Sequence, residues 1–353
     1  MIQKAILFIP DISGFTEFVH HTDIKHSGHI ISELLEVLLD SNSLNFKLAE
    51  IEGDALFLYK LSETIDDKDI ENQVREMYTA FHKHLKRYEY ERICHCGACS
   101  SAYNLSIKFI VHFGEIDFIK VKNSKKPYGS NVIQAHRLLK NDVPLNEYLL
   151  FSEGARPISN GDETLTVGKY DFGEIKYTYQ SLELLKKDIP YVPPVPEDVP
   201  KHFLYEIIEK IKAPMPEVYE IISYFDYRLL WAKGIDKLEY DKNKVNKSGR
   251  KHKCIINKNL TVDQKTITKK VKENQLVYGE STSEMPMMRA FNVYFILGED
   301  NNKDTILNIQ AYADFKPLGR LLKPIMTRKL LKNSKENIKN LVMLIESDFE
   351  TTI

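Results

Sequence analysis

Two aspartates stand where carboxylates can serve as metal ligands. Asp11 follows the apolar run 5–9, which predicts a buried strand, so its carboxylate lies at an edge of the sheet. Asp54 occupies a tight turn between two strand-like segments, 46–51 and 55–59. If these strands are neighbours, both carboxylates can share divalent cations, because Mg2+ prefers hard oxygen ligands. Two metals held in this way would activate an attacking hydroxyl and stabilise a leaving oxygen.

The residues after Asp11 suit a phosphate group. The Ser13-Gly14 pair lets the backbone turn tightly, and a helix is expected to start near Thr16. Amides near a helix start, at Gly14, Phe15 and Thr16, can face phosphate oxygens. The alternative is that Asp11 only caps this helix, as aspartate often does.

The elements around these residues alternate between strands and helices. Apolar spacing predicts helices over 16–39, 70–90 and 130–140. Strands are expected at 104–112 and 115–121, in addition to those that carry the aspartates. This order predicts an α+β fold in which helices pack on an antiparallel or mixed sheet.

A proline-rich stretch divides the chain. Residues 189–200 contain five prolines, which exclude a continuous helix or a central strand and favour an extended linker. The predicted domains are therefore residues 1–188 and 201–353, which agrees with the chain length of 353 residues.

The second domain is predicted to be a strand, a short helix, several antiparallel strands and a long final helix. The first strand is 202–211, the short helix 216–225 and the final helix 318–349. The strands between are expected at 236–240, 252–257, 266–271, 275–282, 289–297 and 305–314. This order describes a helix-grip fold, in which a curved sheet wraps the last helix.

Four segments of the first domain resemble the class III adenylate/guanylate cyclase family, in the family's order. They are Phe8 to Thr16, Gly53-Asp54-Ala55, Val111 to Ile116 and Tyr128 to Leu138. The first resembles Phe-x-Asp-Ile-x-Gly-Phe-Thr, and the last resembles Gly-x-x-Val-Asn-x-Ala-x-Arg-Leu. The resemblance covers about residues 4–180 and implies a ferredoxin-like catalytic domain.

The resemblance implies a site for a nucleoside triphosphate. Asp11 and Asp54 would bind two Mg2+ or Mn2+ ions, with the carbonyl of Ile12, and Arg137 would neutralise charge on the α-phosphate. The family forms its site between two head-to-tail subunits, so a homodimer is implied. The reaction would be attack of the ribose 3'-hydroxyl on the α-phosphorus, which yields a cyclic nucleotide and pyrophosphate.

Three positions depart from the family pattern. Ile133 stands where the family has the asparagine that positions the ribose, and Asn131 lies two residues earlier. Glu50, at the base-selecting position, can accept from guanine N–H groups and favours GTP over ATP. Its partner position falls near Lys126, which matches neither subclass. The alternative function is therefore a pseudo-cyclase that binds nucleotide without turnover.

A compact group of soft ligands lies at Cys94, Cys96 and Cys99. Thiolates are zinc ligands, but this spacing needs a further ligand from elsewhere. The alternative is a loop of reduced thiols.

The second half of the chain resembles the START-like (SRPBCC) family. The resemblance covers about residues 201–350 and rests on the strand, the Ala213-Pro214 pair, and a helix that ends near Trp231. It implies a cavity for an apolar small molecule between the sheet and the last helix. A third function is then possible, a ligand carrier whose first domain only dimerises.

Composition limits the other classes. A formal net charge of -1 predicts neither a nucleic-acid partner nor membrane binding. No apolar window is long enough for a transmembrane segment, and a signal peptide is not expected. Clustered cysteines without a disulfide framework suit a cytoplasmic protein.

Overall fold

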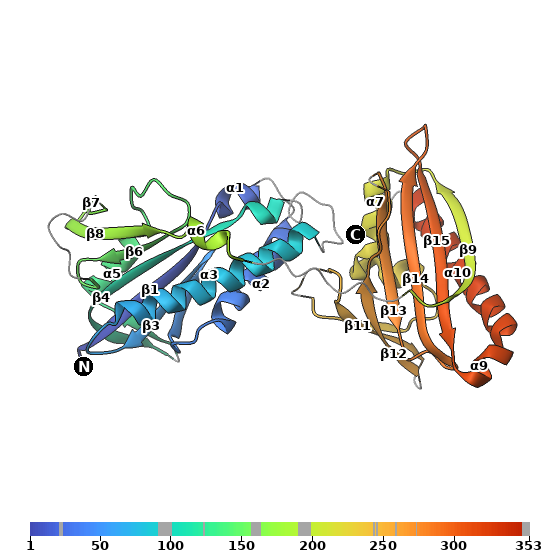
Figure 1. Cartoon of the computed structure of the whole chain (residues 1–353), viewed down its shortest axis with the longest axis horizontal. Helices are drawn as coiled ribbons and strands as arrows, with labels where there is room; N and C mark the ends of the chain where they lie inside the picture. The colour runs from blue at the N-terminus through green and yellow to red at the C-terminus, as the bar shows by residue number, and fades with distance from the viewer. Residues whose placement is uncertain are drawn as a thin grey trace. The chain divides into compact units, whose positions relative to one another are not determined.

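The chain folds as two compact units, one with the described residues up to 189 and the other with those from 199 onward (Figure 1). The computed structural model describes residues 1–20, 24–90, 101–122, 124–156, 164–189, 199–242, 244, 246–257, 260–272 and 274–347. Both units combine helices with a sheet, so the predicted α+β class is confirmed.

The first unit is built on one sheet with the order β2-β3-β1-β4-β6-β8-β7, and β5 pairs with β4. The strands are β1 (Gln3–Ser13), β2 (Lys47–Glu52), β3 (Ala55–Leu61), β4 (Ser106–Val121), β5 (Ser124–Tyr128), β6 (Tyr148–Ser152), β7 (Thr166–Tyr170) and β8 (Gly173–Ser181). β1 is antiparallel to both β3 and β4. The order β2-β3-β1-β4 is that of a split βαβ arrangement, which places β1 in the middle of the sheet.

Helices cover both faces of this sheet. They are α1 (Phe15–His20), α2 (Ile24–Asp40), α3 (Asp67–Tyr90), α5 (Ser130–Arg137) and α6 (Glu183–Lys186). Figure 1 shows α2 and α3 running side by side across one face. On the other face, Leu7 and Ile9 of β1 pack in one cluster with Ala135 of α5. Because side chains alternate along a strand, Asp11 faces the same side as Leu7 and Ile9.

Three predicted elements of the first unit need correction. The predicted helix 16–39 is two helices, α1 and α2, and residues 21–23 between them lie outside the described part. The predicted strands 104–112 and 115–121 form one strand, β4, because Gly114 continues the ladder opposite Ala5 rather than making a turn. β5 was not predicted, and it returns along β4 from Ser124, opposite Val121, to Tyr128, opposite Asp117.

The second unit is a seven-stranded antiparallel sheet with the order β10-β11-β12-β13-β14-β15-β9. The strands are β9 (His202–Ile211), β10 (Lys237–Glu239), β11 (Lys251–Asn257), β12 (Leu260–Ile267), β13 (Leu276–Thr282), β14 (Met288–Glu299) and β15 (Thr305–Phe315). β12 begins before the predicted strand 266–271. The apolar pattern did not reveal its first part, because the stretch Asp263-Gln264-Lys265 is polar.

Helices close one side of the second sheet. They are α7 (Met215–Ser223), α8 (Arg228–Trp231), α9 (Pro317–Leu321) and α10 (Lys323–Glu346). The shared core joins Trp231, Tyr278 and Phe295 to Ile338 and Leu341 of α10. None of the helices in the described ranges has the length and apolar character to cross a membrane.

Candidate active site

The structure brings Asp11 and Asp54 to neighbouring backbone positions. Asp11 on β1 lies opposite Ala55, the first residue of β3, and Asp54 directly precedes it in the turn. The amide of Ile12 donates to the carbonyl of Asp54 at 3.2 Å, which ties the turn to β1. Ile12 itself is buried, so its side chain anchors this edge of the site in the core.

The charges around the aspartates show that the two carboxylates interact. Burial, and to a smaller extent the negative charge of Asp11, raise the pKa of Asp54 to about 6. The pKa of Asp11 is also raised by burial, against an opposing effect of Lys108. Lys108 Nζ lies 3.2 Å from Asp11 Oδ2, and this ammonium supplies part of the positive charge that the acid pair needs.

The donor set suits a hard divalent cation. Two carboxylates that disfavour each other's ionisation gain when a cation lies between them. Across the described ranges, no group of three or more His, Cys, Asp or Glu side chains could hold a metal ion. A cation at this site would therefore need oxygen atoms from the backbone, from substrate phosphates or from water, which Mg2+ commonly retains.

The predicted phosphate segment lies beside the hairpin turn. Gly14 has a φ of +87°, and its carbonyl accepts from the amide of Phe18 at 3.0 Å, so α1 starts here. Gly53 has a φ of +65°, and a Cβ placed there would lie 3.9 Å from Phe15. Gly14, Phe15 and the exposed Thr16 are thus next to the turn that carries Asp54.

The predicted base-selecting residues form an ion pair. Lys126 Nζ of β5 lies 2.6 Å from Glu50 Oε1 of β2, and both side chains are partly exposed. Sequence alone placed Lys126 only near the partner position. The contact places a carboxylate acceptor beside an ammonium donor, and both groups are accessible to solvent.

Within one chain, Arg137 forms a partly exposed ion pair. As the last residue of α5, it places Nη2 2.8 Å from Asp171 Oδ2, in the turn between β7 and β8. Its neighbour His136 faces the hairpin instead, with Nδ1 3.1 Å from Glu52 Oε2 and its ring against Phe57. Of these two residues, His136 is the one with a contact to the hairpin within one chain.

The side-chain amide of Asn131 is engaged in contacts within the chain. Its Nδ2 donates to the carbonyl of Glu115 at 2.8 Å, and its Oδ1 lies 3.0 Å from His112 Nε2. A Cβ at Gly114 would lie 2.3 Å from the Asn131 side chain, so a larger residue there would displace this side chain. His112 also contacts Ser152 Oγ at 2.7 Å, and burial lowers its pKa. The His-x-Gly segment is thus a structural link between β4, α5 and β6, while Ile133 is exposed.

Sequence reasoning missed two residues at this site, Lys108 and His136. Lys108 is opposite Asp11 in the β1–β4 ladder, so its role became visible only once that pairing was known. His136 is next to Arg137 in the sequence, but the resemblance drew attention to the arginine alone. The possible zinc ligands Cys94, Cys96 and Cys99 lie outside the described residues.

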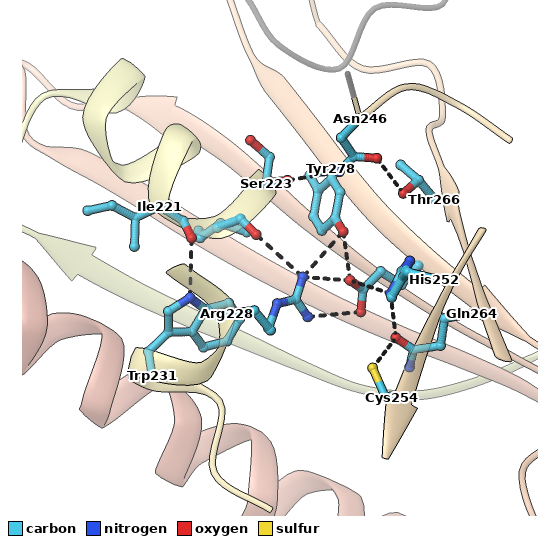
Figure 2. A network of polar contacts seen from close by, with 12 residues as sticks. Ile221, Ser223, Arg228, Trp231, Asn246, His252, Cys254, Gln264, Thr266 and Tyr278 are labelled. Carbon is cyan, nitrogen blue, oxygen red and sulfur yellow. Dashed lines mark hydrogen bonds and ion pairs between the residues drawn. The ribbon is translucent and has the colours of Figure 1, made fainter. Parts of the chain in front are cut away.

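The second unit contains a buried polar network that the sequence did not predict (Figure 2). Arg228 of α8 places Nη2 2.5 Å and Nη1 3.0 Å from the carboxylate of Glu280 on β13. The hydroxyl of Tyr278 donates to Glu280 at 2.6 Å, and His252 Nε2 lies 3.5 Å from the same carboxylate. Cys254 and Gln264 extend the network along β11 and β12.

This network is a structural link, because its ions are paired and shielded from water. Burial raises the pKa of Glu280, but the charge of Arg228 and the contact with His252 outweigh it and hold the pKa well below the ordinary range. Burial also raises the pKa of the Cys254 thiol to about 12, so this cysteine is not a nucleophile at neutral pH. The network ties α8 to the sheet at the side of Trp231.

Comparison with known proteins covers parts of the chain. Residues 31–148 match a family described as "Protein of unknown function (DUF2652)". An uncharacterized protein of Mycobacterium tuberculosis, Rv2561/Rv2562, is 35% identical over 127 residues, which is 35% of this chain and 57% of that protein. The family match includes Asp54 and Lys108 and starts after Asp11.

Solved structures that align with part of the chain include nucleotide cyclases. A bacterial light-regulated adenylyl cyclase aligns with 54% of this chain and 58% of its own length, at 14% identity and a TM-score of 0.38. The guanylate cyclase domain of RhGC from Catenaria anguillulae, in complex with GTP, aligns with 51% of this chain and 98% of its own length, at 14% identity and a TM-score of 0.36.

Proposed function

We propose that the first unit is a two-metal nucleotidyl cyclase domain of ferredoxin-like fold, which converts GTP to its 3',5'-cyclic nucleotide and pyrophosphate. The observation that carries the proposal is the pairing of β1 with β3, which makes Asp11 and Asp54 neighbours. The ordered cyclase-like segments of the sequence support the same function. Mg2+ or Mn2+ ions would supply Lewis-acid activation of the hydroxyl and charge neutralisation at the phosphates.

The residues around the acid pair have separate tasks in this reaction. Asp11 and Asp54 would hold the cations, together with the carbonyl of Ile12, and the backbone at Gly14, Phe15 and Thr16 would receive phosphate oxygens. The ribose 3'-oxygen forms a bond to the α-phosphorus while the bond from that phosphorus to the bridging oxygen breaks. The hydroxyl proton leaves to water, and pyrophosphate departs.

The Glu50–Lys126 pair favours guanine as the base. Guanine presents N–H donors beside the O6 acceptor, whereas adenine presents an N–H donor beside a ring acceptor. A carboxylate at Glu50 accepts from the guanine donors, and the ammonium of Lys126 donates to O6. The 2.6 Å contact between the two side chains keeps them together at one edge, where a single base can meet both.

A head-to-tail homodimer would give Arg137 its catalytic role. In one chain this guanidinium pairs with Asp171, and its partly exposed position leaves it accessible to a second subunit. The proposed dimer places Arg137 of each chain at the α-phosphate that the other chain's aspartates hold. Charge stabilisation of this kind suits a permanent cation.

One experiment separates turnover from binding. The full chain is incubated with each nucleoside triphosphate and Mg2+ or Mn2+, and cyclic nucleotide and bound nucleotide are both quantified. We expect cyclic GTP, with at least roughly a hundredfold loss in Asp11→Asn and Asp54→Asn. Folded aspartate variants that retain full activity would exclude the proposal.

A pseudo-cyclase is the second candidate function. It is favoured by the exposed Ile133, which cannot hydrogen-bond the ribose, and by Asn131, which is committed to His112 and Glu115. In that case the experiment gives metal-dependent GTP binding without product. Absence of both product and binding leaves the third candidate, a carrier whose first unit only dimerises.

We propose a START-like helix-grip fold for the second unit, with an apolar small molecule as its ligand. A groove of about 590 Å3 lies between β9 and α10, and its apolar lining includes Ile207, Ile208, Val342 and Met343. Four charged residues, Glu206, Glu209, Lys335 and Lys339, also line it, so the ligand can carry a polar group. A fluorescent fatty-acid probe should bind the full chain, and Met343→Trp, which fills the groove, should weaken that binding.

A further inference from the structure

Aliphatic side chains are exposed together where β15 leads into α9 and α10. Leu321 is 79% exposed and Ile325 67% exposed, and Leu318 and Leu322 are exposed beside them. We call these four residues the aliphatic patch. Isolated exposed leucines are ordinary on a protein surface, but four within eight consecutive positions form a contiguous apolar surface.

The backbone holds the aliphatic patch outward. Gly319 of α9 is buried, and a Cβ there would lie 2.1 Å from the carbonyl oxygen of Met287. The amide of Lys316 donates to that same carbonyl at 2.9 Å. α9 is therefore docked through its glycine, and a core cluster that includes Phe315, with Met326 packed against it, already fills the space on the inner side.

The segment that carries the aliphatic patch is rich in basic residues and contains no acidic ones. Between Phe315 and Glu336 the sequence has no aspartate or glutamate. It has seven lysines and arginines, which are Lys316, Arg320, Lys323, Arg328, Lys329, Lys332 and Lys335. In the part of the chain that the structure describes, none of the seven is in an ion pair. In a chain of net charge -1, this is a strong local excess of positive charge.

We propose that the aliphatic patch and the basic residues of its segment form a docking surface for an anionic lipid bilayer. Aliphatic side chains can enter the boundary between headgroups and acyl chains, while lysines and arginines meet lipid phosphates and carboxylates. Nucleic acid suits the surface less well, because the patch has no aromatic side chain on which bases could stack. A second copy of the chain suits it less well too, because a two-fold contact would bring the seven basic residues of each copy together.

The test uses the full chain and vesicles of phosphatidylcholine with or without phosphatidylserine. Co-sedimentation should occur only with phosphatidylserine and should weaken as salt is added. The triple variant Lys323→Gln, Arg328→Gln, Lys329→Gln should lower the affinity on the order of a hundredfold. The double variant Leu321→Glu, Ile325→Glu should abolish binding, because it removes insertion and adds negative charge.

Matched controls change other exposed residues of the second unit. The triple variant Lys251→Gln, Lys270→Gln, Lys272→Gln removes the same charge, and Leu230→Glu alters another exposed leucine. Both should bind vesicles as the unmodified chain does. The proposal is overturned by equal binding to both vesicle types, by equal losses in the controls, or by no vesicle binding. It is also overturned if the patch variants lose a dimer or a DNA complex instead of vesicle binding.

Discussion

Lys108 Nζ lies 3.2 Å from Asp11 Oδ2, so a lysine ammonium of the same chain partly neutralises the pair of aspartates. The two residues are directly opposite in the β1–β4 ladder, and both side chains are mostly buried. A metal ion at this site and the Lys108 ammonium would both bind the carboxylate of Asp11. Lys108 therefore stabilises the charged form of Asp11 in the metal-free chain and would compete with a metal ion for this carboxylate.

Replacement of Lys108 by methionine should strengthen metal binding. Met keeps the apolar stem but removes the competing charge, so Mn2+ affinity should rise roughly fivefold, or about 1 kcal/mol. Titration calorimetry with Mn2+ alone measures this change. Lys4→Met is the matched control, because Lys4 is also on β1 but faces the exposed Glu63 at 3.9 Å. A weaker Mn2+ affinity in Lys108→Met would show that Lys108 orients Asp11 rather than competing for it.

Asp54 should titrate near pH 6 in the metal-free chain. Burial and the charge of Asp11 raise its pKa to about 6, so between about pH 4 and 6 the folded chain keeps a proton that the unfolded chain releases. The free energy of unfolding attributable to this group should therefore fall as pH rises through that window. Carboxyl carbon NMR measures the titration directly. Asp11→Asn should lower the pKa of Asp54, and Lys108→Met should raise it. If neither substitution changes the pKa of Asp54, the two carboxylates do not interact.

The local elements were predictable from the sequence, whereas the contacts between them were not. The apolar run of β1 and the turn at Gly53 are local signals, and the structure places β1, β2 and β3 where those signals lie. The Lys108–Asp11 and Glu50–Lys126 pairs depend on strand order and register, which periodicity does not encode. Gly114 misled the strand prediction because glycine often marks a turn, but here it makes room for Asn131.

Exchange of the charges at Glu50 and Lys126 should change the preferred base. In Glu50→Lys with Lys126→Glu, the donor and acceptor trade places and match the adenine edge instead. The ratio of GTP to ATP affinity should fall at least roughly tenfold, as measured with fluorescent nucleotide analogues whether or not turnover occurs. The exchange Lys4→Glu with Glu63→Lys reverses an exposed pair and should leave the ratio unchanged. An unchanged ratio in the first exchange would remove Glu50 and Lys126 from the base site.

Inactive variants should restore activity to each other if the site is shared between subunits. A heterodimer of Asp11→Asn and Arg137→Ala chains has one site with both substitutions and one site with neither. Random pairing of equal amounts should therefore give about a quarter of the unmodified activity. Cyclic nucleotide formation in the mixture measures it, and a mixture of Asp11→Asn with Asp54→Asn is the control, since both defects belong to the same half-site. No recovery in the first mixture would place Arg137 outside the partner's site.

Loss of the charge on Glu280 should destabilise the second unit. Glu280→Gln leaves Arg228 buried without its counter-ion, which costs about 3 kcal/mol or more in the free energy of unfolding. Because the folded pKa is held below the ordinary 4.5, stability from this group is complete above that pH and is lost as pH falls below it. Trp231, the single tryptophan, contacts Arg228 and reports denaturant unfolding of this unit alone. Glu280→Gln should reduce the dependence of the free energy of unfolding on pH at acidic pH, whereas the exposed Glu299→Gln should not change this dependence.

Replacement of both partners, Arg228→Met with Glu280→Leu, should recover part of the lost stability. If the destabilisation of the double variant equals the sum of the two single losses, Arg228 and Glu280 are not energetically coupled.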